Sequence, residues 1–137
     1  MNEDLADYEI TIKEAHLDTF GHVNNAVYLA LFEEARWEMI TSRGYGLAEV
    51  MKYKVGPTIL EVNLKFRKEI KNRDRITIRT SVASDSGKIT RLKQVMINAK
   101  GEEACVAEFV IGLFDLKERK LISPTPEWKA ALGLPLK

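Results

Sequence analysis

Five stretches of the chain have the pattern of a β-strand, and in the first three apolar and polar residues alternate with a period of two, which is typical of a strand with one buried face. The first stretch runs from about Asp7 to Ala15, and the others cover about 60–67, 75–82, 88–99 and 103–115. Short turns separate the last four, so we expect a mainly antiparallel sheet of five strands, with the second and third joined as a hairpin. The last stretch is apolar on both faces, which favours a central position in the sheet.

Between the first two strands the apolar residues recur at spacings of three and four, which predicts a helix. Asn24 or Asn25 would cap its start, and Gly44 lies beyond its end, about four to five turns later. The first half of this helix is apolar nearly all round, so we expect its beginning to be the more deeply buried end. A loop follows as far as the second strand, and a short helical turn follows Thr125.

This order of elements predicts a single α+β domain spanning residues 1–137, with a five-stranded, mainly antiparallel sheet and one long helix. One helix cannot cover both faces of such a sheet, so the other face needs an apolar partner. A symmetric homodimer or homotetramer, formed by continuing the sheet or by packing helix to helix, would supply that partner.

Composition and charge narrow the class of protein. The formal net charge is only +1, so nothing global favours binding to nucleic acid or to an anionic membrane. The first twenty residues lack the segments of a secretory signal, and the apolar runs are too short to span a bilayer. Cys105 is the only cysteine and lies in a strand pattern, where we interpret it as a small core residue. We therefore expect a soluble, cytoplasmic protein.

The segment 16–25, which joins the first strand to the helix, carries the candidate chemistry. Asp18 precedes a helix start, where unpaired N–H groups and the helix dipole favour negative charge. Such a start can stabilise an oxyanion on an acyl carbonyl, while a carboxylate beside it acts as nucleophile or as general base for water. Spacing alone nevertheless favours the plainer interpretation, an Asx-turn at Asp18 and helix caps at Asn24 and Asn25.

Two histidines stand near Asp18. His22 is more readily interpreted as a packed loop histidine than as a catalytic base. His16, Asp18 and His22 could approach a metal ion, but their spacing matches no established zinc pattern. We expect neither a metal nor a cofactor.

The residues at the start of the helix form a recognisable motif, which reads Asp18-x-x-Gly21-His22-Val23-Asn24-Asn25-Ala26-x-Tyr28 and continues as Glu34-Ala35-Arg36. The motif resembles the hotdog-fold acyl-CoA thioesterases of the 4-hydroxybenzoyl-CoA thioesterase type. The resemblance covers essentially the whole chain. It implies a hotdog fold, in which the sheet wraps around one long central helix, and an enzyme that hydrolyses an acyl-CoA to the free acid and CoA without a cofactor.

The resemblance also implies roles for individual residues. Asp18 matches the aspartate that acts as nucleophile or water-activating base, and Gly21 matches the glycine that lets the loop turn. Asn25 occupies the position whose backbone N–H polarises the thioester carbonyl. Tyr28 matches a residue for which packing and substrate contact are equally expected, and His22 is a possible assistant to the aspartate.

Three positions depart from the pattern of many relatives. His16 stands where many relatives have a second aspartate, Asn25 where some have a histidine, and Glu69 where many have a proline. Without a histidine at position 25, a general-base route rests mainly on Asp18, with His22 as its assistant.

Another hotdog branch uses a glutamate on the central helix, a role that Glu33 or Glu34 could fill. With Asp18 present, we interpret Glu34 as pairing with the neighbours of Arg36 or with a partner subunit at the substrate site. Basic residues near strand ends could bind the phosphates of CoA, or could equally be solvated: Arg67, Lys68, Lys88, Arg91 and Lys93. An acyl pocket could be lined by four residues of the loop after the helix: Leu47, Met51, Tyr53 and Val55.

Two further functions stay open. The same chemistry would serve an acyl thioester carried by acyl carrier protein. A fold does not fix a function, so the chain could also be a non-catalytic module that binds acyl thioesters. A hotdog dehydratase is disfavoured, because the sequence lacks a recognisable histidine and acidic pair.

Overall fold

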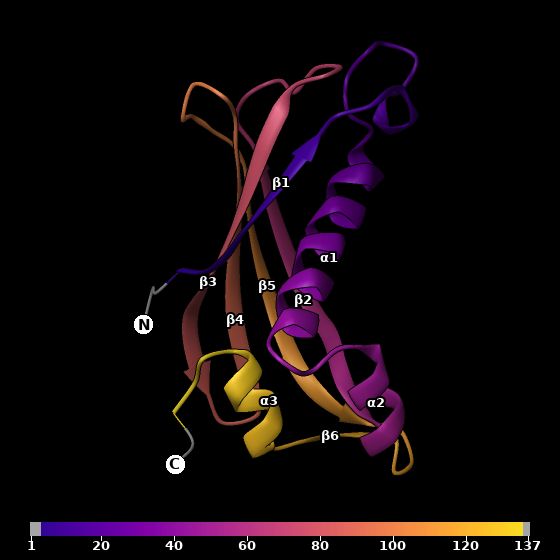
Figure 1. Ribbon diagram of the computed structural model, residues 1–137, viewed down its shortest axis with the longest axis vertical. Helices are drawn as coiled ribbons and strands as arrows, with labels where there is room; N and C mark the ends of the chain where they lie inside the picture. Colours follow the sequence, from indigo (N-terminus) through magenta and orange to yellow (C-terminus); the bar gives the residue numbers. More distant parts are fainter. Residues whose placement is uncertain (1–3, 136–137) are drawn as a thin grey trace.

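The computed structural model describes residues 4–135, which form one six-stranded antiparallel sheet and three α-helices (Figure 1). The strands are β1 (Asp4–Thr11), β2 (Val55–Phe66), β3 (Arg75–Ser86), β4 (Ile89–Ile97), β5 (Glu103–Asp115) and β6 (Lys120–Ile122). The helices are α1 (Asn25–Ser42), α2 (Leu47–Tyr53) and α3 (Pro126–Ala131), with a short 3-10 turn η1 (Glu14–His16).

The sheet has the strand order β1-β3-β4-β5-β2, and β6 pairs with the end of β5. It curves around the long helix α1, which lies along its concave face (Figure 1). The predicted α+β class, with a mainly antiparallel sheet around one long helix, is confirmed. The sixth strand, β6, was not predicted, because a strand of three residues is too short to establish a period.

The predicted hairpin between the second and third strands is wrong. β2 pairs with β5, with Phe66 opposite Cys105, whereas β3 lies between β1 and β4. Alternation shows that a strand has two different faces but does not identify its neighbour. β5 does lie between two strands, as expected from its apolar character.

Helix α1 has the predicted position, but not the predicted burial. The Asn24 side chain caps it by accepting a hydrogen bond from Ala26 N at 2.9 Å. Its buried residues form one stripe against the sheet: Tyr28, Leu31, Phe32, Ala35, Met39 and Ile40. Asn25, Ala26 and Leu29 are exposed, so the expectation of a more deeply buried beginning is wrong. At the beginning of α1, no residue of 4–135 covers the apolar side chains that face away from the sheet.

Several boundaries also differ from the sequence expectation, since β2 begins at Val55 rather than near 60 and β3 continues to Ser86. The first strand ends at Thr11, and Ala15 lies in the 3-10 turn. The expected loop after α1 contains α2, whose apolar Leu47 and Val50 are one turn apart. This helix ends at Tyr53, and the next residue, Lys54, has a left-handed backbone with a φ of 58°.

The core lies between α1 and the sheet. Cys105 is fully buried there, and burial raises the pKa of its thiol to about 11, so its interpretation as a core residue is confirmed. No helix within residues 4–135 combines the length and the apolar character needed to cross a membrane.

Candidate active site

A tight turn over residues 18–22 precedes helix α1. Asp18 Oδ1 accepts hydrogen bonds from the backbone N–H groups of Phe20 at 2.8 Å and His22 at 3.2 Å. Gly21 allows the turn with a φ of 81°. The Asx-turn interpretation is therefore correct, but it uses one carboxylate oxygen only. Within residues 4–135 the second oxygen, Oδ2, has no hydrogen-bond partner.

Backbone contacts fix this turn to the start of the helix. Asn24 N donates to the carbonyl oxygen of His16 at 3.0 Å, and Leu17 forms an isolated bridge with Val23. The His16 ring accepts at Nδ1 from Lys13 N at 2.9 Å, so it caps the 3-10 turn. In the part of the chain that the structure describes, no group of three His, Cys, Asp or Glu side chains could hold a metal ion.

The first residue of α1 presents an unused backbone donor. The Asn24 cap satisfies Ala26 N, and Val27 N donates to the Asn24 carbonyl oxygen at 2.9 Å. Among the hydrogen bonds of residues 4–135, none uses the N–H of Asn25. This N–H lies at the positive end of the helix dipole, where it can donate to a developing negative charge.

The Asn25 end of α1 borders an open hollow of about 360 Å³, which we call the site hollow. Its lining consists of His22, Val23, Asn25, Tyr28, Phe66, Arg67, Lys68, Glu69 and Ile70. Tyr28 is buried and packs edge to face on Phe66, with ring centroids 4.9 Å apart. Asp18 is not part of the lining, but its backbone N–H donates to the carbonyl oxygen of His22 at 2.8 Å. The turn thus holds the predicted aspartate against His22, a residue of the lining.

Glu69 is the site residue that sequence reasoning did not identify as functional. Its carboxylate contacts Nε2 of His22, and Lys71 Nζ lies 3.7 Å from its other oxygen. Glu69 belongs to the connection between β2 and β3, so its distance from His22 could not be inferred from spacing. The only signal was its occurrence where many relatives have proline.

The predicted phosphate-binding residues separate into two groups. Arg67 and Lys68 line the site hollow and form exposed ion pairs with Glu103 at 3.3 Å and Glu102 at 3.5 Å. Three residues lie outside that lining: Lys88 is exposed in the turn before β4, and β4 carries exposed Arg91 and half-buried Lys93.

Glu34 does not line the site hollow, and within residues 4–135 it does not pair with the neighbours of Arg36, whereas its pairing with a partner subunit stays a prediction. Its carboxylate accepts a hydrogen bond from the Tyr8 hydroxyl of β1, on the side of α1 away from β2. Arg36 instead donates to Gln94 Oε1 at 3.0 Å. The sequence showed that Glu34 lies close to Arg36 on α1, but it did not show that Tyr8 of β1 packs against Glu34.

Comparison with known proteins identifies the family. Residues 12–132 match the family model of the Thioesterase-like superfamily. The chain belongs to this superfamily. Its antiparallel sheet around α1 is the hotdog fold, as the sequence resemblance implied, and the expectation of a thioester hydrolase is confirmed at the level of this superfamily.

Several known proteins resemble the chain over most of its length. Long-chain acyl-CoA thioesterase FadM of Escherichia coli is 27% identical over 125 residues, which are 90% of this chain and 94% of FadM. DHNA-CoA thioesterase of Staphylococcus aureus superposes with a TM-score of 0.83 at 24% identity, covering 93% of this chain and 88% of its own. A Staphylococcus aureus protein solved in complex with CoA has a TM-score of 0.88 at 16% identity, covering 97% and 84%.

Proposed function

We propose that the chain hydrolyses an acyl-CoA to a free acid and CoA at the site hollow. The observation that carries the proposal is the free N–H of Asn25, which starts α1 beside the turn that holds Asp18. A thioester carbonyl oxygen placed against this N–H gains negative charge as the carbonyl carbon is attacked, and the N–H stabilises it. Because a thiolate leaves readily, no strong general acid is needed.

Asp18 supplies the attacking group through Oδ2. The turn restrains Oδ1 with two N–H groups and leaves Oδ2 for chemistry. As a nucleophile, Oδ2 forms a bond to the acyl carbon while the carbon–sulfur bond breaks, and water then cleaves the anhydride. As a general base, Oδ2 takes a proton from water, which attacks the same carbon. An acyl adduct on Asp18, detected by mass spectrometry during turnover, would assign the nucleophilic route.

The choice of CoA as the carrier rests on charge and on relatives. Arg67 and Lys68 line the site hollow, where their side chains can pair with phosphates. FadM acts on long-chain acyl-CoA, and the Staphylococcus aureus relative binds CoA. We therefore propose that the enzyme is of the 4-hydroxybenzoyl-CoA thioesterase type. The proposal includes a cytoplasmic location and a chain that acts as one thioesterase domain.

Acyl carrier protein is the second candidate carrier. An acyl-acyl carrier protein thioesterase of Arabidopsis thaliana, ATL3, is 30% identical over 78 residues, which are 57% of this chain and 41% of that protein. Hydrolysis of one acyl group carried on CoA and on acyl carrier protein, measured side by side, separates the two carriers.

A second copy of the chain completes the proposed enzyme. β2 is twelve residues long and, within residues 4–135, pairs with β5 on one side alone; its exposed apolar side chains include Leu60, Val62 and Phe66. An open edge of this length with apolar side chains favours pairing with another strand. We expect light scattering to give at least a dimer, and Val62→Lys to shift the protein toward the monomer.

The substitution Asp18→Asn tests the proposed function. Asparagine retains an oxygen that can accept from Phe20 N and His22 N, so the turn and the fold should survive. We expect turnover of acyl-CoA, followed by thiol release, to fall by about two or more orders of magnitude. Unchanged turnover in a folded Asp18→Asn protein would show that Asp18 is not the catalytic carboxylate.

A further inference from the structure

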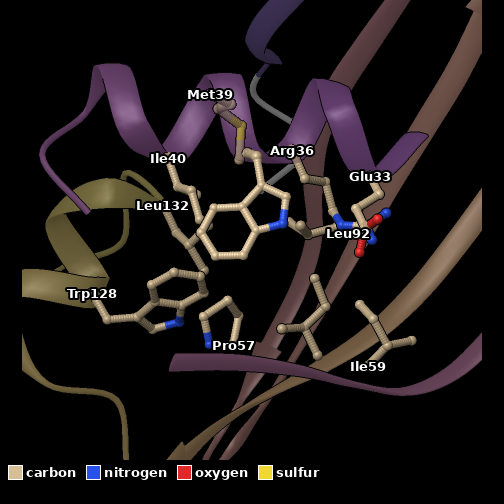
Figure 2. Close-up of a pocket in the computed structure, with 11 residues that line it drawn as sticks. Glu33, Arg36, Met39, Ile40, Pro57, Ile59, Leu92, Trp128 and Leu132 are labelled. Carbon is tan, nitrogen blue, oxygen red and sulfur yellow. The ribbon is translucent and has the colours of Figure 1, made fainter. Parts of the chain in front are cut away.

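A second hollow, of about 80 Å³, lies between α1, β2, the sheet and α3, and we call it the distal hollow. Figure 2 shows the heads of Arg36 and Glu33 together at one end of it, and Trp128 and Leu132 at the other. The walls between them are mainly apolar and include Trp37, which carries an indole N–H, together with Ile40, Pro57, Ile59 and Leu92. The distal hollow therefore has one charged end and one apolar end.

Arg36 places a half-buried positive charge at one end of the distal hollow. Its Nη1 donates to Gln94 Oε1 at 3.0 Å, and its guanidinium carbon lies 4.2 Å from the centre of the Phe109 ring. No carboxylate oxygen of residues 4–135 lies within 4.0 Å of it. Burial lowers the pKa of Arg36 to about 10, so the group is still protonated at neutral pH. A half-buried guanidinium with one side-chain acceptor has N–H groups left for a ligand.

Glu33 supplies an acceptor beside this donor. It precedes Arg36 by three residues on α1, so the two side chains leave the same side of the helix. The two heads form no ion pair with each other, although both line the distal hollow. A hydroxyl group can accept from Arg36 and donate to Glu33 at the same time, whereas Glu33 would repel a carboxylate.

The distal hollow lies far along α1 from the oxyanion site. Arg36 follows Asn25 by eleven residues, so the two are about 16 Å apart along the helix axis. Exposed Leu29 on α1 and Val62 on β2 provide apolar surface between the two hollows. An acyl chain lying along α1 would reach Arg36 only in its distal half.

The size of the distal hollow limits what can lie beyond Arg36. Its volume of about 80 Å³ is smaller than the cavities of about 150 Å³ that admit benzene. The apolar walls suit a hydrocarbon, and this volume suits a short linear end better than a ring. The distal hollow therefore suits a linear chain with one polar group before its end.

We propose that the distal hollow is an acyl subsite that selects linear acyl thioesters with a hydroxyl group in the distal half of the chain. The hydroxyl lies between Arg36 and Glu33, and the hydrocarbon end lies against Trp128 and Leu132. This inference rests on the proposed function, because the thioester end of the same ligand lies at Asn25.

A positional series of substrates tests the proposal. Hexadecanoyl-CoA is compared with isomers whose single hydroxyl moves stepwise from the second carbon to the terminal one. We expect kcat/KM to peak for a hydroxyl in the distal half, at least about tenfold above the value for hexadecanoyl-CoA. A chain without the hydroxyl would leave the polar groups of Arg36 and Glu33 unpaired when it binds. A flat series, or a peak next to the thioester, overturns the proposal.

Two variants and one control connect that peak to the named residues. Arg36→Met removes the donor, and Glu33→Leu removes the acceptor at an exposed position where the fold does not depend on it. Each should abolish the peak, whereas Arg75→Met, which removes an exposed arginine paired with Glu9 at 3.2 Å, should retain it. A peak that persists in folded Arg36→Met or Glu33→Leu protein overturns the assignment.

Binding of the free acids separates this inference from the proposed function. If no thioester is cleaved, the proposed function fails, but calorimetry can still compare hexadecanoic acid with its distal hydroxy derivative. We expect the wild-type protein to bind the hydroxy acid at least about tenfold more tightly than hexadecanoic acid. The Arg36→Met protein should bind the two acids with equal affinity. Equal affinities in the wild-type protein would overturn the inference without reference to catalysis.

Discussion

Nε2 of His22 contacts the carboxylate of Glu69 across the site hollow. This contact joins the Asp18 turn to the connection between β2 and β3, two segments that are distant in the sequence. Within residues 4–135, Nδ1 of His22 has no hydrogen-bond partner. We therefore expect Glu69 to act as a positioning residue, which holds the His22 ring and leaves its other nitrogen unpaired.

The first prediction concerns Glu69→Ala. Both side chains of the pair are about half exposed, so the contact contributes little to stability, and the unfolding midpoint should change by little. We expect kcat to fall about tenfold with KM almost unchanged. Removal of a residue that itself transfers a proton lowers kcat about a hundredfold or more, so the loss here should be smaller. Steady-state thiol release measures both constants.

Lys71→Met is the matched control for that variant. It removes the second partner of Glu69 but leaves the contact with His22, so kcat should be retained. If Lys71→Met lowers kcat as much as Glu69→Ala does, then kcat depends on the charges of the β2–β3 connection and not on the orientation of His22.

The second prediction concerns Asn25→Pro. Proline is favoured at the first position of a helix and removes the N–H without removing an intrahelical hydrogen bond. The preceding Asn24 has an extended backbone, with φ −63° and ψ 140°, as a residue before proline requires. We expect kcat to fall by about 10² to 10³, the loss seen when one oxyanion donor is removed.

Asn25→Ala retains the N–H and serves as the control, so it should keep most of the activity. Circular dichroism and thermal unfolding of both variants verify that α1 is intact. Equal activity of folded Asn25→Pro and Asn25→Ala would remove the Asn25 amide from the mechanism.

The third prediction concerns ionisation of Tyr8. Its hydrogen bond to Glu34, together with burial, raises the pKa of the phenol from 10.0 to about 12. Because the folded value exceeds the unfolded one, the contribution of Tyr8 to stability is complete below pH 10 and is lost as the pH rises through 12. The ultraviolet absorbance of phenolate, taken as the difference between wild type and Tyr8→Phe, measures this titration.

Glu34→Ala should move the pKa of Tyr8 back toward 10, whereas Glu38→Ala should move it much less, because Glu38 is the smallest of the causes. A similar shift in the two variants would contradict the assignment of Glu34 as the hydrogen-bond partner. The same Glu34→Ala protein should retain acyl-CoA turnover, since Glu34 lies outside the site hollow.

The fourth prediction concerns the cap of α1. Asn24→Ala removes the acceptor for Ala26 N and should lower the free energy of unfolding by about 1 kcal/mol. Asn24→Asp retains an acceptor and adds a negative charge at the positive end of the helix, so its stability should match or exceed that of the wild type. Urea unfolding measures both. No loss in Asn24→Ala would mean that water replaces the cap fully.

Local chemistry made much of this protein predictable. Period-two alternation located the strands, and the bounds of β5 agree with the predicted 103–115. Asn24 and Gly44 bracket α1 because their side-chain and backbone preferences act within a few residues. The motif from Asp18 to Tyr28 was sufficient to predict the family, and the turn at Asp18 and the start of α1 lie where the motif placed them.

The amino-acid sequence by itself determined the class of the fold, the position of α1 and the two groups proposed for chemistry, Asp18 and the Asn25 amide. Only the tertiary structure decided that β2 pairs with β5, that Glu69 contacts His22 and that Glu34 bonds to Tyr8. The reason is physical: capping, turns and alternation depend on neighbours along the chain, whereas strand pairing and side-chain contacts depend on the packing of distant segments around one core.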